Sequence, residues 1–69
     1  MKVKKSVPAI QGRYRHQNGY TYSVEGIYRE EDLGVWFVAH RGEHDGRRWV
    51  RSVKNFLGVK NGKPRFVPV

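Results

Sequence analysis

The residues of this chain with the clearest chemical potential are its arginines and the tryptophan among them. Arg47, Arg48 and Arg51 surround Trp49, and Lys54 follows closely. A guanidinium group can bind a phosphate through two parallel hydrogen bonds, and an exposed tryptophan ring offers a surface on which a nucleobase stacks. The cluster around Trp49, together with the arginines of two other predicted strands, predicts a nucleic-acid-binding surface. Its residues are Arg13, Arg15, Arg41, Arg47, Arg48, Trp49, Arg51 and Lys54.

An alternative is that Trp49 belongs to the core and that the arginines only keep a small domain in solution. The side-chain alternation of the strand around residues 48–53 does not decide this, because Trp49 and Val50 are both candidates for the inside.

The charge is unevenly distributed along the chain. The 69 residues carry a formal net charge of +8, and all six acidic residues lie between positions 25 and 45. Seven lysines and arginines, with no acid among them, follow Asp45. Both ends are therefore basic, which is typical of proteins that bind nucleic acid or acidic surfaces.

Few other residues have the types and spacing that catalysis or metal binding requires. The chain has no cysteine, which excludes disulfide scaffolds, thiol catalysis and cysteine-ligated zinc. His40 and His44 are four residues apart, but at a strand end and a turn this spacing does not converge on a metal, and we expect one packed histidine and one turn histidine. His16 is expected to be a hydrogen-bonded residue at the edge of the core. We therefore expect a non-catalytic protein without metal or cofactor.

The elements that must position these residues are short β-strands. Tyr, Val, Trp, Phe and Ile are frequent after Gly12, glycines recur every several residues, and no segment sustains a 3.6-residue apolar period. One helical turn is predicted at Ser52–Leu57, with Ser52 as its N-cap and Gly58 as its stop. The predicted strands are Arg13–Gln17, Tyr20–Tyr28, Val35–Arg41, Arg48–Val53 and Arg65–Val69, with turns at Asn18-Gly19, Asp45-Gly46 and Asn61-Gly62.

The first hairpin has a predicted register. A three-residue turn, Gln17-Asn18-Gly19, pairs Tyr14 with Tyr22 and separates an apolar face from one that carries Arg13 and Arg15. A two-residue turn would mix aromatic residues and arginines on each face.

The same three-residue turn at His44-Asp45-Gly46 predicts that Glu43 pairs with Arg47 in the second hairpin. In that register Arg41, Trp49 and Arg51 share one face.

The fold class that these strands predict is all-β. About five short strands in fewer than 60 residues are too few for a two-sheet sandwich, so we expect a small SH3-like barrel of strongly bent antiparallel strands with one short helical turn. Residues 1–11 are expected to form a flexible basic arm, and residues 12–69 a single domain. The absence of cysteine, of a signal-peptide pattern and of an apolar run of about 20 residues predicts an unprocessed cytoplasmic protein.

Two sequence blocks carry a resemblance to a known family. The chain reads Gly12-x-Tyr14-Arg15-His16-x-x-Gly19-x-x-Tyr22-x-Val24-x-Gly26-x-x-Arg29 early, and Trp49-Val50-Arg51 followed by Phe56 late. Over residues 12–57 this resembles the bacterial domain-of-unknown-function family 1653, whose members read Y-R-H-x-x-G-x-x-Y-x-V-x-G-x-A-R-H and W-V-R-P-x-x-M-F. Ser52 stands where the family has proline, and Glu30-Glu31-Asp32-Leu33 replaces its His-Ser-Glu-Thr segment. The resemblance implies a small β domain of bacterial or phage origin and carries over no catalytic residue.

Two functions are expected from these observations. The first is electrostatic binding of DNA or RNA by a small monomeric module. The alternative is a protein–protein adaptor or inhibitor, encoded by a phage or mobile element, that docks on an acidic host protein through its charge or through an exposed sheet edge.

Overall fold

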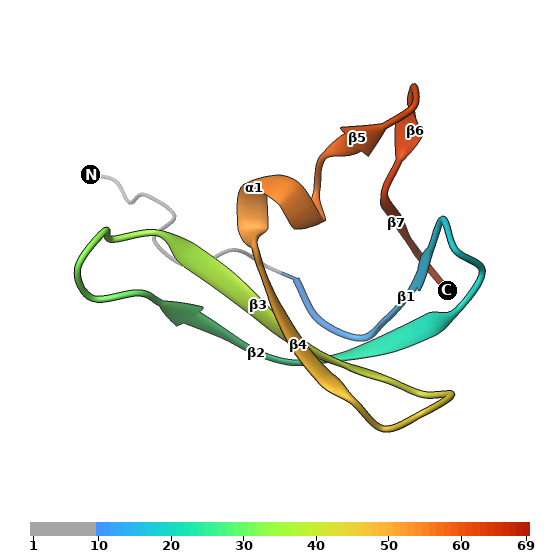
Figure 1. The fold of residues 1–69 in the computed structure, drawn as a ribbon, viewed down its shortest axis with the longest axis horizontal. Coiled ribbons are helices and arrows are strands. Elements are labelled where there is room, and N and C mark those ends of the chain that lie inside the picture. Colours follow the sequence, from blue (N-terminus) through green and yellow to red (C-terminus); the bar gives the residue numbers. More distant parts are fainter. Residues whose placement is uncertain (1–9) are drawn as a thin grey trace, which may run out of the picture.

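The fold, obtained as a computed structural model, is described for residues 10–69. Its main element is one antiparallel sheet with the strand order β4-β3-β2-β1-β7 (Figure 1). These strands are β1 (Arg13–His16), β2 (Thr21–Arg29), β3 (Trp36–Gly42), β4 (Arg48–Ser52) and β7 (Phe66–Pro68). One helical turn, α1 (Val53–Phe56), and a small hairpin of β5 (Val59–Lys60) and β6 (Lys63–Pro64) connect β4 to β7. The predicted all-β class with five antiparallel strands and one helical turn is confirmed.

The sheet is curved but does not close into the SH3-like barrel that the sequence predicts. β4 pairs only with β3, and β7 pairs only with β1, among the strands of residues 10–69. After β4 the chain turns into α1 and the β5–β6 hairpin, which lie over the hollow side of the sheet in Figure 1. The opening between the two edges is where the candidate site lies.

The first hairpin has the register that the sequence predicts. Tyr14 pairs with Tyr22 and Arg13 with Ser23, and the turn is closed by the Gly19 amide, which donates to the His16 carbonyl over 2.9 Å. Gly19 has φ +93°, a conformation in which a side chain would be strained. Tyr14 and His16 consequently face the core, and Arg13 and Arg15 face solvent.

The predicted register of the second hairpin is wrong by one residue. Arg41 pairs with Arg48 and His40 with Trp49, so Glu43 does not pair with Arg47. Instead, the Glu43 amide donates to the Thr21 carbonyl over 3.0 Å. This register leaves four residues in the loop, and the Gly46 amide closes the loop by donating to the Gly42 carbonyl over 2.8 Å.

This shift separates residues that the sequence places together. Arg41 lies with Arg48 on the outer face of the sheet, whereas Trp49 and Arg51 lie on the inner face with His40. The prediction that Arg41 shares a face with Trp49 and Arg51 is therefore wrong.

A bulge in β2 lets the long strand follow the curvature. The register shifts between Val24 and Gly26, so Glu25 has no partner in β3. Gly26 leaves room for the ring of Tyr28, because a Cβ at this glycine would lie 2.6 Å from the Tyr28 hydroxyl oxygen.

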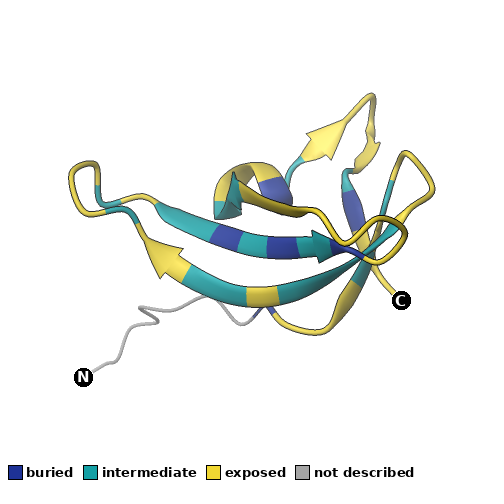
Figure 2. Ribbon diagram, turned by 60° about the horizontal axis from the view of Figure 1, so that its bottom comes forward, coloured by how far each residue is buried: buried dark blue, intermediate teal, exposed yellow. Residues whose placement is uncertain are grey.

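The core lies between the inner face of the sheet and the segments that cover it. Ile10, Val38, Phe56 and Phe66 are buried, and half-buried residues such as Tyr14 and Tyr22 pack against them (Figure 2). Because Ile10 belongs to this core, packing extends two residues beyond the domain boundary predicted at Gly12. The rest of the predicted arm, residues 1–9, lies outside the described residues.

Ser52 caps α1 as the sequence predicts, since its hydroxyl accepts the Asn55 amide over 3.1 Å. The predicted turn at Asn61-Gly62 connects β5 to β6, and both of its residues have positive φ. No helix within residues 10–69 has the length and apolar character needed to span a membrane.

Candidate nucleic-acid interface

Four of the eight residues predicted to bind nucleic acid form ion pairs with acidic side chains, and three of these lie on the outer face of the sheet. Glu25 accepts hydrogen bonds from Arg41 and Arg48 over 3.2 and 3.0 Å. In the β3–β4 loop, Arg47 lies 3.9 Å from Asp45. Arg13 pairs with Glu43 on the outer face. The positive charge of these arginines is therefore largely compensated within the protein.

The Arg13–Glu43 pair has the best geometry of these contacts. The Arg13 guanidinium donates to both carboxylate oxygens over 2.7 and 2.8 Å, and the Ser23 hydroxyl donates to the same carboxylate over 2.7 Å. These hydrogen bonds lower the pKa of Glu43 to about 2 and raise that of Arg13. Glu43 thus stays ionised and paired at neutral pH.

The remaining predicted residues occupy different places. Arg15 is exposed on the outer face of β1, and Lys54 is exposed on α1. Of the eight predicted residues, Trp49 and Arg51 are the two that line the same pocket. The predicted set therefore does not form a single surface.

The pocket lies on the inner face, between β4 and the strands β1 and β7. Its volume is about 230 Å³. Trp49 is half exposed at the pocket, with 50% of its surface accessible, whereas His40 is 4% accessible. The side chains that shape the pocket are His16, Tyr22, His40, Trp49, Arg51 and Phe66.

Arg51 brings an unsatisfied hydrogen-bond donor to this pocket. Its Nε is buried and has no hydrogen-bond partner among the described residues. Burial lowers the pKa of Arg51, and the nearby charge of Arg65 lowers it further, yet an arginine keeps its proton at neutral pH. A buried donor without a partner costs about 1–3 kcal/mol, so a change in the Arg51 side chain that brings its Nε to an acceptor in the pocket is favoured.

The two pocket histidines are neutral and have different tautomers. His40 Nδ1 lies 3.0 Å from the Val38 carbonyl and must donate to it, whereas His16 Nδ1 accepts the Asn18 amide over 3.0 Å. The free Nε2 of His16 therefore carries the proton, and that of His40 does not. Burial lowers the pKa of both rings, and the charge of Arg51 adds to this effect. The sequence-based interpretations of His16 as a core-edge residue and His40 as a packed residue are confirmed.

His44 is the turn histidine that the sequence predicts. Its ring stacks on Tyr20 with a centroid distance of 3.8 Å. Among residues 10–69, no group of three or more His, Cys, Asp or Glu side chains is arranged to hold a metal ion.

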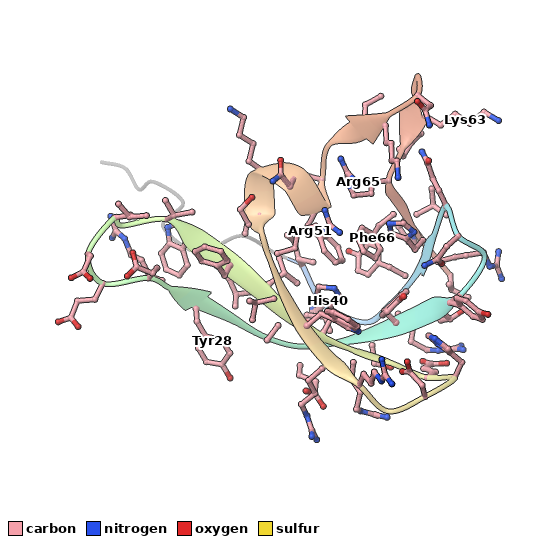
Figure 3. The ribbon with its side chains drawn as sticks, viewed as in Figure 1. Tyr28, His40, Arg51, Lys63, Arg65 and Phe66 are labelled. Carbon is pink, nitrogen blue, oxygen red and sulfur yellow. The ribbon has the colours of Figure 1, made fainter. Side chains whose placement is uncertain are left out.

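Several lysines and arginines without a carboxylate partner lie on β4, on α1 and on the segment from β5 to β7, and Arg51 among them lines the pocket. Arg51 and Arg65 lie over the inner face near His40 and Phe66, and Lys63 extends from the β5–β6 hairpin (Figure 3). Arg65 Nε donates to the Asn55 carbonyl over 3.1 Å, which fixes its side chain against α1. Within the described part of the chain, none of these cations forms an ion pair with a carboxylate; we call them the basic rim, which consists of Arg51, Lys54, Lys60, Lys63 and Arg65.

The β5–β6 hairpin is held near the pocket by Gln17. Its side-chain amide lies 2.8 Å from the Lys60 carbonyl and 3.0 Å from the Lys63 carbonyl. Lys60, Lys63 and Arg65 are absent from the predicted site. The available signal was the lack of any acidic residue after Asp45, which leaves every later cation without a nearby partner in sequence.

Comparison with known proteins identifies the family. No curated protein and no solved structure matches the chain. The family described as "Protein of unknown function (DUF1653)" matches residues 12–68. The match continues past Phe56 through β7, so the C-terminal segment, which the sequence-based resemblance left out, belongs to the family domain.

The structure explains why the motif residues alternate. His16 of the first block and Trp49 and Arg51 of the second all line the pocket, whereas Arg15 lies on the other face. The match over most of the chain confirms the resemblance that these blocks carry, and the chain belongs to the DUF1653 family of proteins of unknown function.

Proposed function

We propose that this protein is a binding module for single-stranded nucleic acid. The observation that carries the proposal is the division of charge between the two sides of the sheet. Glu25 and Glu43 pair with Arg13, Arg41 and Arg48 on the outer face, where Arg15 has no carboxylate partner among the described residues. The basic rim has none there either, and its Arg51 lines the same pocket as the half-exposed Trp49. A strand that follows the basic rim would place its phosphates on the cations and one base on the indole ring.

The physical basis is that of non-specific single-strand binders. Phosphate contacts release counterions, so affinity falls as salt rises, and stacking of one base on an aromatic ring contributes about 1–3 kcal/mol. Duplex DNA does not expose its base faces for stacking, and therefore the module should prefer single strands.

The test is a salt series of binding to a fluorescent oligothymidylate, measured by anisotropy. We expect the log of the association constant to fall linearly with log salt. Each phosphate contact removed should flatten the slope by about 0.7. Lys63→Gln should produce this change, and Trp49→Ala should lower the affinity without changing the slope.

A matched variant on the outer face provides the control. Arg48→Gln removes one positive charge on the outer face, where Glu25 pairs with both Arg48 and Arg41. It should leave the slope close to that of the wild type. Equal effects of Lys63→Gln and Arg48→Gln, or binding that is insensitive to salt, would contradict the proposal.

A second candidate is a protein–protein adaptor, which the open sheet favours. β4 is an edge strand that pairs only with β3 among the described strands, and its Val50 is exposed. A partner segment could add to this edge as a further strand, with charge complementarity to an acidic protein. A partner that stays bound after nuclease treatment and high-salt washing, together with salt-insensitive oligonucleotide binding, would favour this function over the first.

The proposal includes the cellular context of the module. We place it in the cytoplasm, because a chain without cysteine suits a reducing compartment. We also propose that it is a non-catalytic monomer without cofactor. Size-exclusion chromatography with light scattering tests the monomer.

A further inference from the structure

The pocket combines a small volume, an unsatisfied arginine donor and an aromatic wall. We propose that it binds the terminal phosphate monoester of a nucleotide, with the phosphate at Arg51 and Arg65 and the attached base against Trp49. This inference rests on the proposed nucleic-acid function and specifies the part of the ligand that enters the pocket.

The charge of Arg51 and Arg65 favours a phosphate monoester. Arg65 is close enough to Arg51 for its charge to lower the pKa of Arg51, in addition to the effect of burial, and neither arginine pairs with a carboxylate among residues 10–69. Two neighbouring positive charges repel each other, and an anion bound near both offsets this repulsion. A phosphate monoester carries about −1.5 to −2 at neutral pH, which matches two guanidinium groups better than a singly charged backbone diester does.

The hydrogen-bond donors of the pocket residues also favour a phosphate. Arg51 and His16 both line the pocket. The buried Nε of Arg51 has no partner among the described residues, and the tautomer of His16 makes its Nε2–H the ring donor. Phosphate oxygens only accept hydrogen bonds, so they suit a pocket whose free polar groups are mainly donors. Figure 3 shows Arg51 and Arg65 on the same side of the sheet, over His40 and Phe66.

The size and shape of the pocket favour the end of a strand. The pocket volume of about 230 Å³ is below the roughly 300–1,000 Å³ of pockets that enclose drug-sized ligands. The buried residues His40 and Phe66 form part of its wall. Such a pocket holds a phosphate and part of a base, and therefore favours the end of a strand over its middle.

The experiment compares oligothymidylates of the same length that end in a 5′-phosphate, a 3′-phosphate or hydroxyl groups only. Binding is measured at neutral pH and fixed ionic strength. One phosphorylated end should bind at least tenfold more tightly than the unphosphorylated strand. Thymidine monophosphates and inorganic phosphate are titrated in parallel, because they distinguish a free nucleotide from a strand end as the source of the phosphate.

Variants locate the effect. Arg51→Gln should abolish the preference for the phosphorylated end, and Arg51→Lys should weaken it because lysine keeps the charge but loses the planar fork. Arg48→Gln, on the other face, should preserve the preference. An independent readout is the NMR signal of the Arg51 Nε–H in the unmodified protein, which should shift on titration with the phosphorylated end and not with the unphosphorylated strand.

The outcomes separate this inference from the function on which it rests. Equal, salt-dependent binding of all three strands, with no shift of the Arg51 signal, overturns the phosphate site and leaves the nucleic-acid function intact. Binding of thymidine monophosphate without salt-dependent binding of any strand supports the phosphate site and overturns the nucleic-acid function. Absence of binding by every ligand overturns both.

Discussion

Phe56 of α1 and Phe66 of β7 stack on each other, with ring centroids 4.0 Å apart and an interplanar angle of 10°. Both rings are buried. Phe56 also contacts Tyr14 and His40 edge to face, at centroid distances of 5.2 and 5.4 Å. This stack joins the C-terminal segment to the helical turn and to the sheet, and it lies directly beneath the pocket, of which Phe66 forms a wall.

The first prediction concerns this stack. Phe66→Ala should destabilise the protein by about 3–5 kcal/mol, because it leaves a cavity between Phe56 and His16. A chain of this length has a free energy of unfolding of roughly 3–10 kcal/mol, so the variant should lose most of its stability. Urea unfolding followed by circular dichroism measures the effect, and Val67→Ala, at an exposed neighbour, is the control. A loss below 1 kcal/mol for Phe66→Ala would contradict the assigned core.

The second prediction concerns Trp49. Because the side chain is half exposed, Trp49→Ala should cost about 1–2 kcal/mol of stability, less than the roughly 3–5 kcal/mol of a fully buried aromatic residue. The variant should stay folded while its affinity for single strands falls. Thermal unfolding and anisotropy on the same preparation measure both quantities. An unfolded variant would instead show that Trp49 is part of the core.

The third prediction concerns acid stability. The pKa of Glu43 is about 2 in the folded protein, below its ordinary value of 4.5. The folded state therefore holds the ionised form, and this contribution is present above about pH 4.5 and is lost as the pH falls towards 2. Wild-type stability should decline across this window, and Glu43→Gln should show a smaller decline. Glu31→Gln, in the exposed acidic loop, should decline as the wild type does.

The fourth prediction concerns the two pocket histidines. Burial lowers the pKa of His16 and of His40, so the unfolded chain binds protons more readily than the folded one. Stability should therefore be complete above the ordinary histidine pKa of about 6.5 and should fall as the pH drops below it. His40→Asn, which retains a donor near the Val38 carbonyl, should reduce this pH dependence. An unchanged slope in a His16→Asn/His40→Asn double variant would contradict the assignment.

Local features of the sequence were sufficient to predict the first hairpin and the helical turn. Tyr14 and His16 alternate with Arg13 and Arg15, and only the three-residue turn at Gly19 places the two sets on opposite faces. The cap at Ser52 depends on an amide three residues away. Because the interacting groups lie within one hairpin or one helical turn, the sequence specifies their geometry.

The second hairpin and the site depend on contacts between distant segments. Glu43 is held by Arg13, which lies 30 residues earlier, and its amide bonds to Thr21, so a rule based on the loop alone misplaces the register by one residue. The same shift decides that Trp49 and Arg51 face the pocket while Arg41 does not.

The sequence by itself determined the all-β class, the family and the excess of positive charge. The tertiary structure decided which of those charges remain free. Carboxylates from β2 and from the β3–β4 loop reach Arg13, Arg41 and Arg48 on the outer face, whereas none reaches Arg15, Arg51 or Arg65 among residues 10–69. Charge compensation depends on distances of a few ångströms between residues far apart in the chain, and these distances exist only once the sheet has curved around its core.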